Sequence, residues 1–156
     1  MPEQTLVTVK QLSIKLGGQT IIPNLSFEVY HNEILGIVGE SGSGKSITAM
    51  SLMGLLPKQG ESLQASRLDF GAQSLIPFDE KRFRALRGKE IGMVFQDPMS
   101  SLNPSMRCGK QIEEVITLHS SLPKKDHQAH LLSLLEKVKL SDPKSIAKLY
   151  PHQLSG

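Results

Sequence analysis

The segment "GESGSGKS", Gly39 to Ser46, decides the fold of this chain. It fits the pattern G-x-x-x-x-G-K-[ST], in which a glycine-rich loop wraps a polyphosphate with its backbone N–H groups. Glycines permit the unusual dihedrals and the close backbone approach that such a loop needs. The residues of the predicted phosphate-binding loop before its lysine are Gly39, Glu40, Ser41, Gly42, Ser43 and Gly44.

The segments on either side of the loop support this interpretation. The preceding run "ILGIVG", Ile34 to Gly39, is continuously apolar, which predicts a buried parallel strand. The following residues, Lys45 to Leu56, have helical composition and stop at Pro57. A strand, a loop and a helix in this order place an anion at the helix N-terminus. We expect Lys45 to reach the β- and γ-phosphates of a nucleotide and the Ser46 hydroxyl to ligate Mg²⁺.

Composition limits the possible functions. The 156 residues suffice for one domain with its own core. Eighteen Lys and Arg against fifteen Asp and Glu give a formal charge of only +3, which argues against a nucleic-acid partner. The single Cys108 excludes an internal disulfide framework. Neither a signal peptide nor an apolar run of membrane-spanning length is present, so we expect the chain to meet a membrane only through partners.

Hydrophobic periodicity predicts an α/β fold in three zones. Residues 6–30 alternate between apolar and polar, which indicates short antiparallel strands. A short helix is expected at about residues 79–86 and another buried strand at about 91–95. Further on, apolar residues recur with helical spacing, which predicts two helices. The residues that carry this spacing are Ile112, Val115, Ile116 and His119, then Leu131, Leu134, Leu135 and Val138.

Two downstream motifs resemble those of the ATP-binding subunits of ABC transporters. "MVFQDP" resembles the Q-loop of that family, in which Gln96 would meet Mg²⁺ and the attacking water. "YPHQLSG" resembles the start of the family signature L-S-G-G-Q, interrupted after its first glycine. The resemblance implies that Leu154, Ser155 and Gly156 act in trans on ATP held by a second ATP-binding subunit. It also implies ATP and Mg²⁺ as cofactors.

The phrase "GMVFQDPMSSLNP", with "MSLMGLLP" and "LYPHQLSG", is similar to the subgroup that imports dipeptides, oligopeptides or nickel. This resemblance implies transmembrane permease subunits as partners and a location on the cytoplasmic face of a bacterial plasma membrane. It leaves open whether the subunit forms a homodimer or a heterodimer. We expect residues 97–104 to be the surface that couples to the permease, although a surface loop without a partner is the alternative.

The family pattern divides the chain into three parts. A mainly antiparallel β subdomain covers about residues 1–33, the P-loop core with the Q-loop about 34–104, and a partial helical subdomain about 105–156. The C-terminal part of the P-loop core is expected to be missing, together with the Asp-Glu pair and the switch histidine that support hydrolysis in the family. A nucleotide-binding fragment without turnover is therefore the main alternative to a transport ATPase.

One position departs from the family pattern. The family often stacks an aromatic residue on adenine, and the equivalent position is Leu16, which lacks a π-face.

His127 and His130 lie three residues apart on a predicted helix, but a solvated helix face is favoured over a metal site. A DNA-associated ATPase of the same fold is disfavoured by the Q-loop phrase and by the absence of a basic face.

Overall fold

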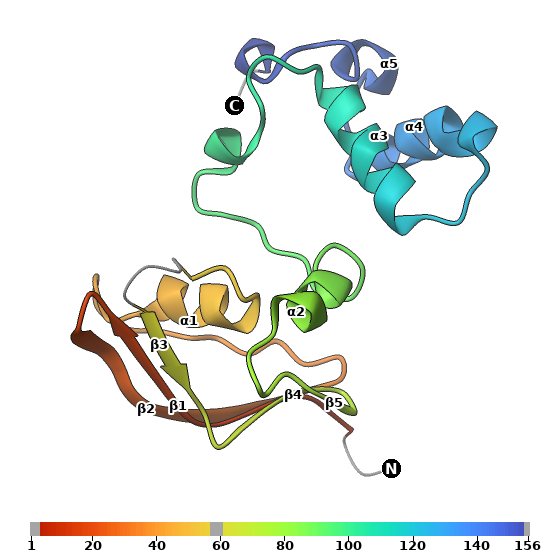
Figure 1. Cartoon of the computed structure of the whole chain (residues 1–156). Helices are drawn as coiled ribbons and strands as arrows, with labels where there is room; N and C mark the ends of the chain where they lie inside the picture. The colour runs from red at the N-terminus through yellow and green to blue at the C-terminus, as the bar shows by residue number, and fades with distance from the viewer. Residues whose placement is uncertain (1–3, 57–60, 155–156) are drawn as a thin grey trace. The chain divides into compact units, whose positions relative to one another are not determined.

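The computed structural model describes residues 4–56 and 61–154. The chain forms two compact units, Met1–Arg87 and Gly88–Gly156 (Figure 1). Among its described residues, the first unit contains a five-stranded sheet and two helices. The second unit is helical among its described residues.

The sheet of the first unit is built around two long strands, β1 (Thr5–Leu16) and β2 (Gln19–Tyr30), paired as an antiparallel hairpin. Three short strands complete it: β3 (Glu61–Gln64), β4 (Arg67–Phe70) and β5 (Gln73–Ser74). The far edge of β1 pairs with β4 along its first half and with β3 along its second half, both antiparallel. The predicted antiparallel pairing is confirmed, but β1 and β2 are 12 residues each and not short as predicted, because the hairpin pairing continues along both strands. The sheet also takes strands from residues 61–74.

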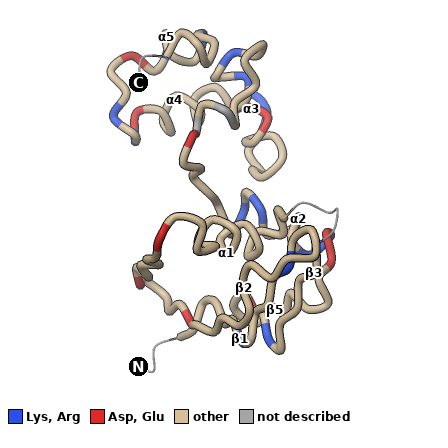
Figure 2. Tube along the Cα trace, turned by 90° about the vertical axis from the view of Figure 1, so that its left-hand side faces the viewer, with Lys and Arg blue, Asp and Glu red and all other residues tan. Residues whose placement is uncertain are grey.

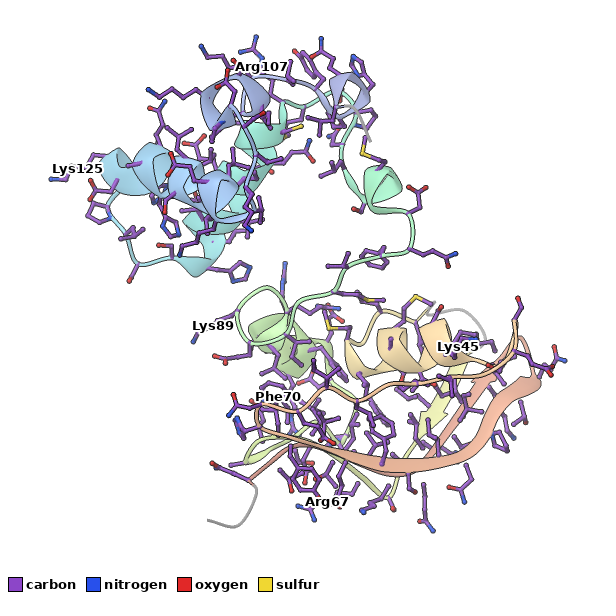
Figure 3. The ribbon with its side chains drawn as sticks, turned by 180° about the vertical axis from the view of Figure 1, so that it is seen from behind. Lys45, Arg67, Phe70, Lys89, Arg107 and Lys125 are labelled. Atoms are coloured by element: carbon purple, nitrogen blue, oxygen red, sulfur yellow. The ribbon has the colours of Figure 1, made fainter. Side chains whose placement is uncertain are left out.

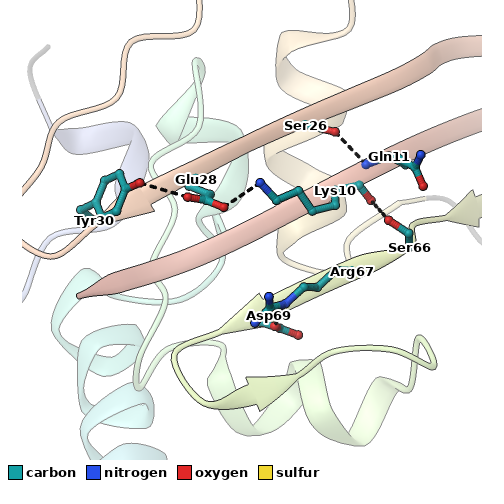
Figure 4. Close-up of polar contacts among 8 residues, drawn as sticks. All are labelled: Lys10, Gln11, Ser26, Glu28, Tyr30, Ser66, Arg67 and Asp69. Atoms are coloured by element: carbon teal, nitrogen blue, oxygen red, sulfur yellow. Dashed lines mark hydrogen bonds and ion pairs between the residues drawn. The ribbon is translucent and has the colours of Figure 1, made fainter. Parts of the chain in front are cut away.

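Polar contacts join the strands on the exposed face of this sheet (Figure 4). Lys10 on β1 forms a 2.6 Å ion pair with Glu28 on β2, and the Tyr30 hydroxyl donates a hydrogen bond to the same carboxylate at 3.0 Å. Both contacts hold the pKa of Glu28 below its usual range, the hydrogen bond from Lys10 most of all. Gln11 adopts a positive φ of 53°, and its N–H donates to the Ser26 hydroxyl at 2.9 Å, which stabilises a bulge in β1.

The opposite face of the sheet forms the core of the first unit. Val9, Leu12 and Ile14 on β1 are fully buried, and Leu68 on β4 is 1% exposed. Helix α1 (Lys45–Leu52) lies across the sheet, and α2 (Glu80–Leu86) follows β5 (Figure 1). The helix predicted near residues 79–86 is confirmed as α2. Asp79 caps its start by accepting a hydrogen bond from the Lys81 N–H at 3.1 Å.

Helix α1 ends four residues earlier than the sequence predicted. Its C-cap is Met53, and Gly54 follows with a positive φ of 61°, the left-handed conformation that commonly terminates a helix. The Arg87 guanidinium donates hydrogen bonds to the carbonyl oxygens of Met53 and Gly54, both at 3.3 Å, and pairs with Glu80. Arg87 therefore holds the C-terminal end of α1 against α2.

The prediction of two buried parallel strands from continuous apolar runs is wrong. Residues 33–40 and 92–95 have no regular secondary structure, and Ile34 and Val94 are 98% and 90% exposed. A strand is stabilised by hydrogen bonds to a neighbour, and neither segment pairs with a strand within the described ranges. The apolar composition of these segments thus did not suffice to make them strands.

The second unit is a helical hairpin with short flanking helices. Its long helices are α3 (Cys108–His119) and α4 (His127–Lys137), and α5 (Pro143–Ile146) follows. Three single-turn 3-10 helices, η1 (Pro98–Ser101), η2 (Lys124–Asp126) and η3 (Pro151–Gln153), complete the unit. Ile116, Leu131 and Leu135 form the core between α3 and α4, which confirms the two helices predicted from periodicity.

Candidate nucleotide-binding site

The glycine-rich loop connects the segment after β2 to the first residue of α1. The Ser43 N–H donates to the Glu40 carbonyl at 3.2 Å, so residues 40–43 form a tight turn. Gly42 and Gly44 have φ values of 80° and 90°, a region that residues with a Cβ rarely adopt. The loop backbone therefore depends on glycine at both positions.

Gly44 also has to be glycine because of its surroundings. It is buried, and a Cβ built on it would lie 2.4 Å from the Cδ1 atom of Ile22 on β2. Carbon atoms that are not bonded do not pack at that distance, so a side chain here would force the end of the Ile22 side chain to move. The loop is thus anchored to the sheet at Gly44, whereas residues 39–43 remain exposed.

Lys45 reaches back across the loop (Figure 3). Its ammonium donates hydrogen bonds to the carbonyl oxygens of Gly39 at 2.8 Å and Glu40 at 2.7 Å, and lies 3.4 Å from the Ser43 hydroxyl. These contacts place a positive charge against the carbonyl oxygens of the turn. The predicted lysine therefore lies where an anion wrapped by the loop would meet it.

The first turn of α1 supplies further donors. The first intrahelical bond runs from the Thr48 N–H to the Gly44 carbonyl at 2.8 Å, so the preceding N–H groups of Lys45, Ser46 and Ile47 have no acceptor within the helix. The positive end of the helix dipole lies at the same place. Ser46 is exposed there, which leaves its hydroxyl available as an oxygen ligand.

Two polar residues that support this turn were missed by the sequence analysis. Thr48 is 2% exposed, and its hydroxyl donates to the Gly44 carbonyl at 3.0 Å. Ser51 is 1% exposed and donates to the Thr48 carbonyl at 2.7 Å. The only signal in the sequence was the helical spacing of small polar residues in "KSITAMSL", which does not by itself indicate burial.

Leu16 is the last residue of β1 and is half-buried. It pairs with Gln19 across the hairpin and with Glu61 on β3. Its side chain offers an aliphatic surface, so any contact with a base there would rest on apolar burial instead of ring stacking. Its role in base binding stays a prediction.

Gln96 belongs to the second unit, whereas the loop belongs to the first. It is exposed and precedes η1, which Asp97 caps by accepting a hydrogen bond from the Met99 N–H at 3.2 Å. Its predicted approach to Mg²⁺ stays a prediction. The segment that follows is held to α3 by Gln111, whose side chain accepts from the Asn103 N–H at 2.9 Å and donates to the Asn103 carbonyl at 3.0 Å.

The segment that leads into the predicted signature is also fixed within the second unit. The Tyr150 N–H donates to the Gln153 side chain at 2.9 Å, and the Arg107 guanidinium lies 5.9 Å from the centre of the Tyr150 ring. Leu154 is half-buried. Ser155 and Gly156, to which the sequence analysis assigned the contact in trans, lie outside the described residues.

The expectation of a solvated helix face at His127 is wrong. The side chain is 5% exposed, and its Nε2 atom lies 3.0 Å from the carbonyl oxygen of Leu122. A carbonyl oxygen can only accept, so Nε2 carries a hydrogen, and Nδ1 faces the Thr117 hydroxyl at 3.4 Å. Among the described residues, no group of three His, Cys, Asp or Glu side chains is arranged to hold a metal ion.

Known proteins resemble this chain in sequence and in fold. The dipeptide transport ATP-binding protein DppD of Escherichia coli strain K12 is 41% identical over 155 residues, which cover 97% of this chain and 47% of that protein. The oligopeptide transport ATP-binding protein OppD of Bacillus subtilis strain 168 is 41% identical over 97% of this chain and 43% of its own length. The chain thus spans less than half the length of these curated relatives.

Solved structures show the same fold. A dimeric post-hydrolysis state of the ATP-binding cassette MJ0796, bound to ADP and Pi, matches 96% of this chain and 63% of its own length with a TM-score of 0.76 at 21% identity. The structure of cbiO1 from Clostridium perfringens, part of the ABC transporter complex cbiONQ, matches 98% of this chain and 57% of its own length with a TM-score of 0.70. The predicted fold, that of a partial ABC-type P-loop domain, is therefore confirmed.

In the described part of the chain, no helix has the length and apolar character needed to cross a membrane. The sequence profile of the family described as ABC transporter matches residues 22–156, a range that contains the glycine-rich loop, Lys45, Gln96 and the start of the predicted signature. The family match and the 41% identity to DppD, which extends over 97% of this chain, show that the chain belongs to the ABC transporter family.

Proposed function

We propose that the chain is the nucleotide-binding part of an energy-coupling subunit of a bacterial importer for dipeptides, oligopeptides or nickel, and that it binds Mg·ATP. The observation that carries this proposal is the ammonium of Lys45, held inside a glycine-rich turn at the start of α1. The similarity to dipeptide and oligopeptide transport ATP-binding proteins supports the class of cargo. The nickel alternative rests on the subgroup resemblance alone.

The residues of the loop fit a magnesium nucleotide. A polyphosphate wrapped by residues 39–44 would exchange the carbonyl contacts of Lys45 for charge-assisted hydrogen bonds to phosphate oxygens, which are stronger. Ser46 offers the neutral oxygen that Mg²⁺ accepts together with phosphate ligands. When bound, the ion neutralises charge that develops on the phosphates during transfer to water. Gln96 is the residue proposed to orient that water.

The proposed partners are permease subunits in the membrane and a second ATP-binding subunit of the same or a sister kind. Residues 97–104 are the proposed contact with the permease. Asp97 and Asn103 fix this segment through capping and through Gln111, so it can present a defined surface. The subunit would then lie on the cytoplasmic face of the membrane and meet the bilayer only through these partners.

Binding without turnover is the second candidate function. The segment that precedes the loop, residues 33–40, pairs with no strand in the described part of the chain. Phosphoryl transfer depends on accurate positioning of water, metal and phosphate, whereas binding tolerates looser geometry. The same loop therefore supports nucleotide binding even where its lead-in segment does not position it for catalysis.

A nucleotide titration tests the proposal. We expect the chain to bind Mg·ATP and Lys45→Ala to weaken binding by at least about tenfold, because the phosphates lose a cationic partner. Lys81→Ala, which removes an exposed lysine of α2 in the same unit, is the matched control and should bind like the parent chain. Equal affinity of the parent and the Lys45→Ala variant would refute the site. Phosphate release above the Lys45→Ala background would favour the transport ATPase over binding without turnover.

A further inference from the structure

A cavity of about 380 Å³ opens in the second unit between α3, α4 and α5. Its floor is apolar and is formed by Leu131, Leu132 and Ala147, which belong to or pack against the core of the helical hairpin. Its size falls within the range typical of small-molecule sites. The cavity lies wholly within one compact unit, so its geometry does not depend on the first unit.

The rim of this cavity is strongly cationic. Arg107 and Lys110 contribute from the start of α3, and Lys144 and Lys148 from α5 and the residues after it. Figure 2 colours the Lys and Arg among the described residues blue along the Cα trace. The described residues of the lining include one carboxylate, Glu113, against four cations.

Glu113 does not neutralise the rim as a whole. Its carboxylate pairs with Lys110 at 3.0 Å, and the hydrogen bond from Lys110 holds the pKa of Glu113 below its usual range. Among the described residues, neither Lys144 nor Lys148 forms an ion pair. Like charges gathered around one hollow repel one another, and an anion placed between them removes that repulsion.

We propose that this cavity binds a small organic phosphate, with the phosphate on the cationic rim and an aromatic or aliphatic body on the apolar floor. A dianionic phosphate suits a rim with several cations, because Arg binds it through two parallel hydrogen bonds and Lys binds it as a point charge. The floor of leucine and alanine side chains adds affinity for an apolar body and none for inorganic phosphate.

An occupant of the cavity would join two parts of the unit that already touch. The Gly109 N–H donates to the Ala147 carbonyl at 2.9 Å, and the Cys108 N–H donates to the Leu149 carbonyl at 2.8 Å. A phosphate held by both Lys110 and Lys148 would reinforce this contact. Binding should therefore raise the melting temperature of the chain through linkage.

The probe is 1-naphthyl phosphate. Inorganic phosphate, which has only the anionic group, and 1-naphthol, which has only the aromatic body, are the comparison ligands. Equilibrium dialysis in a Lys45→Ala background prevents the glycine-rich loop from capturing the phosphate. We expect 1-naphthyl phosphate to bind at least about fivefold more tightly than either half, because only the ester uses both the rim and the floor. Equal binding of 1-naphthol would overturn the anion site, and equal binding of inorganic phosphate would overturn the role of the floor.

Charge-matched variants then locate the site. Lys144→Gln with Lys148→Gln should weaken binding at least about fivefold, whereas Lys125→Gln with Lys137→Gln removes the same charge outside the cavity and should stay within about twofold. In the otherwise unaltered chain, amide NMR shifts should change at Gly109, Lys110 and Leu131. Equal losses in both double variants, or shifts confined to the loop of residues 39–46, would overturn the proposal.

Discussion

The Lys45 ammonium donates a hydrogen bond to the Gly39 carbonyl oxygen at 2.8 Å, so the first residue of α1 closes the loop onto its own beginning. The glycines of this loop determine whether the closure is possible, because two of them adopt a left-handed backbone conformation. The first prediction concerns these two glycines, which differ in their surroundings.

Gly44→Ala should damage the loop more than Gly42→Ala. Both changes place a Cβ in the left-handed region, which costs roughly 1–2 kcal/mol. Only at Gly44 does the new atom also meet Ile22, 2.4 Å away, and overpacking of that kind adds about 1–3 kcal/mol. Mg·ATP titration and thermal denaturation of both variants measure the difference. Equal effects of the two changes would show that the Ile22 side chain moves aside with no cost in free energy.

Leu16 should make the site a poor discriminator of bases. Without a stacking ring, GTP should bind within about tenfold of ATP. Leu16→Tyr should strengthen ATP binding, whereas Gln19→Tyr, which adds the same ring at the cross-strand partner, should not. Titration of both nucleotides into each variant is the measurement. A hundredfold preference of the parent chain for ATP would place the base elsewhere.

The exposed apolar segment before the loop should promote self-association. Ile34 and Val38 are 98% and 93% exposed, and unpaired backbone next to apolar side chains recruits other chains. Ile34→Lys with Val38→Lys should therefore reduce concentration-dependent association in light scattering. Leu118→Lys with Val138→Lys, which adds the same two charges at residues that are 77% and 67% exposed, serves as the control and should leave association unchanged. A decrease of the same size in that control would argue that net charge, and not this segment, controls association.

Gly109→Ala should destabilise the chain, although glycine to alanine usually stabilises a helix by about 1 kcal/mol. The new Cβ would lie 2.7 Å from the carbonyl oxygen of Ala147 and 2.9 Å from the Cβ of Ala147, so α3 and the chain after α5 would have to separate. Gly92→Ala, at a glycine with open space around it, is the matched control. Denaturant unfolding of the two variants gives the sign, and a gain in stability for Gly109→Ala would contradict the close contact.

Asp142 should make the second unit sensitive to acid. Its carboxylate accepts a hydrogen bond from the Ser145 N–H at 3.1 Å, and the hydrogen bonds from Ser145 hold the pKa of Asp142 below its usual range. A depressed carboxyl pKa stabilises the fold above the unfolded pKa, near 4, and that stability is lost as pH falls through the folded pKa. Asp142→Ala should therefore lower the melting temperature at neutral pH and converge with the parent chain in acid. A constant difference at every pH would indicate that the carboxylate charge plays no part.

Periodicity predicted the elements whose partners lie nearby in sequence. The alternation through Val7 and Val9 predicted β1, and the helical spacing around Ile116 and Leu131 predicted α3 and α4, because each element packs against the next one along the chain. The apolar run through Ile37 indicated only that the segment needs burial, and burial depends on a distant strand that composition cannot specify. A strand prediction from such a run is therefore weaker than a helix prediction from spacing.

The candidate site was predicted as far as its motif extends. The loop pattern identified Lys45 and the glycines, because their chemistry is fixed by spacing within a few residues. The burial of His127 was not predictable in the same way, since it depends on where the turn after α3 places the Leu122 carbonyl. Thr48 was missed for a similar reason, because the sequence does not distinguish a buried threonine that supports the loop from one that faces solvent.

Helix α1 is held at both of its ends. Its start contacts Ile22 through the bare backbone of Gly44, and the carbonyls just beyond its last turn accept hydrogen bonds from Arg87. The direction of its dipole is therefore set when the first unit folds, and an arriving anion does not have to order the helix. Preorganisation of this kind lowers the entropic penalty of association, and capture of the anion is then governed by diffusional encounter and long-range attraction instead of rearrangement of the helix.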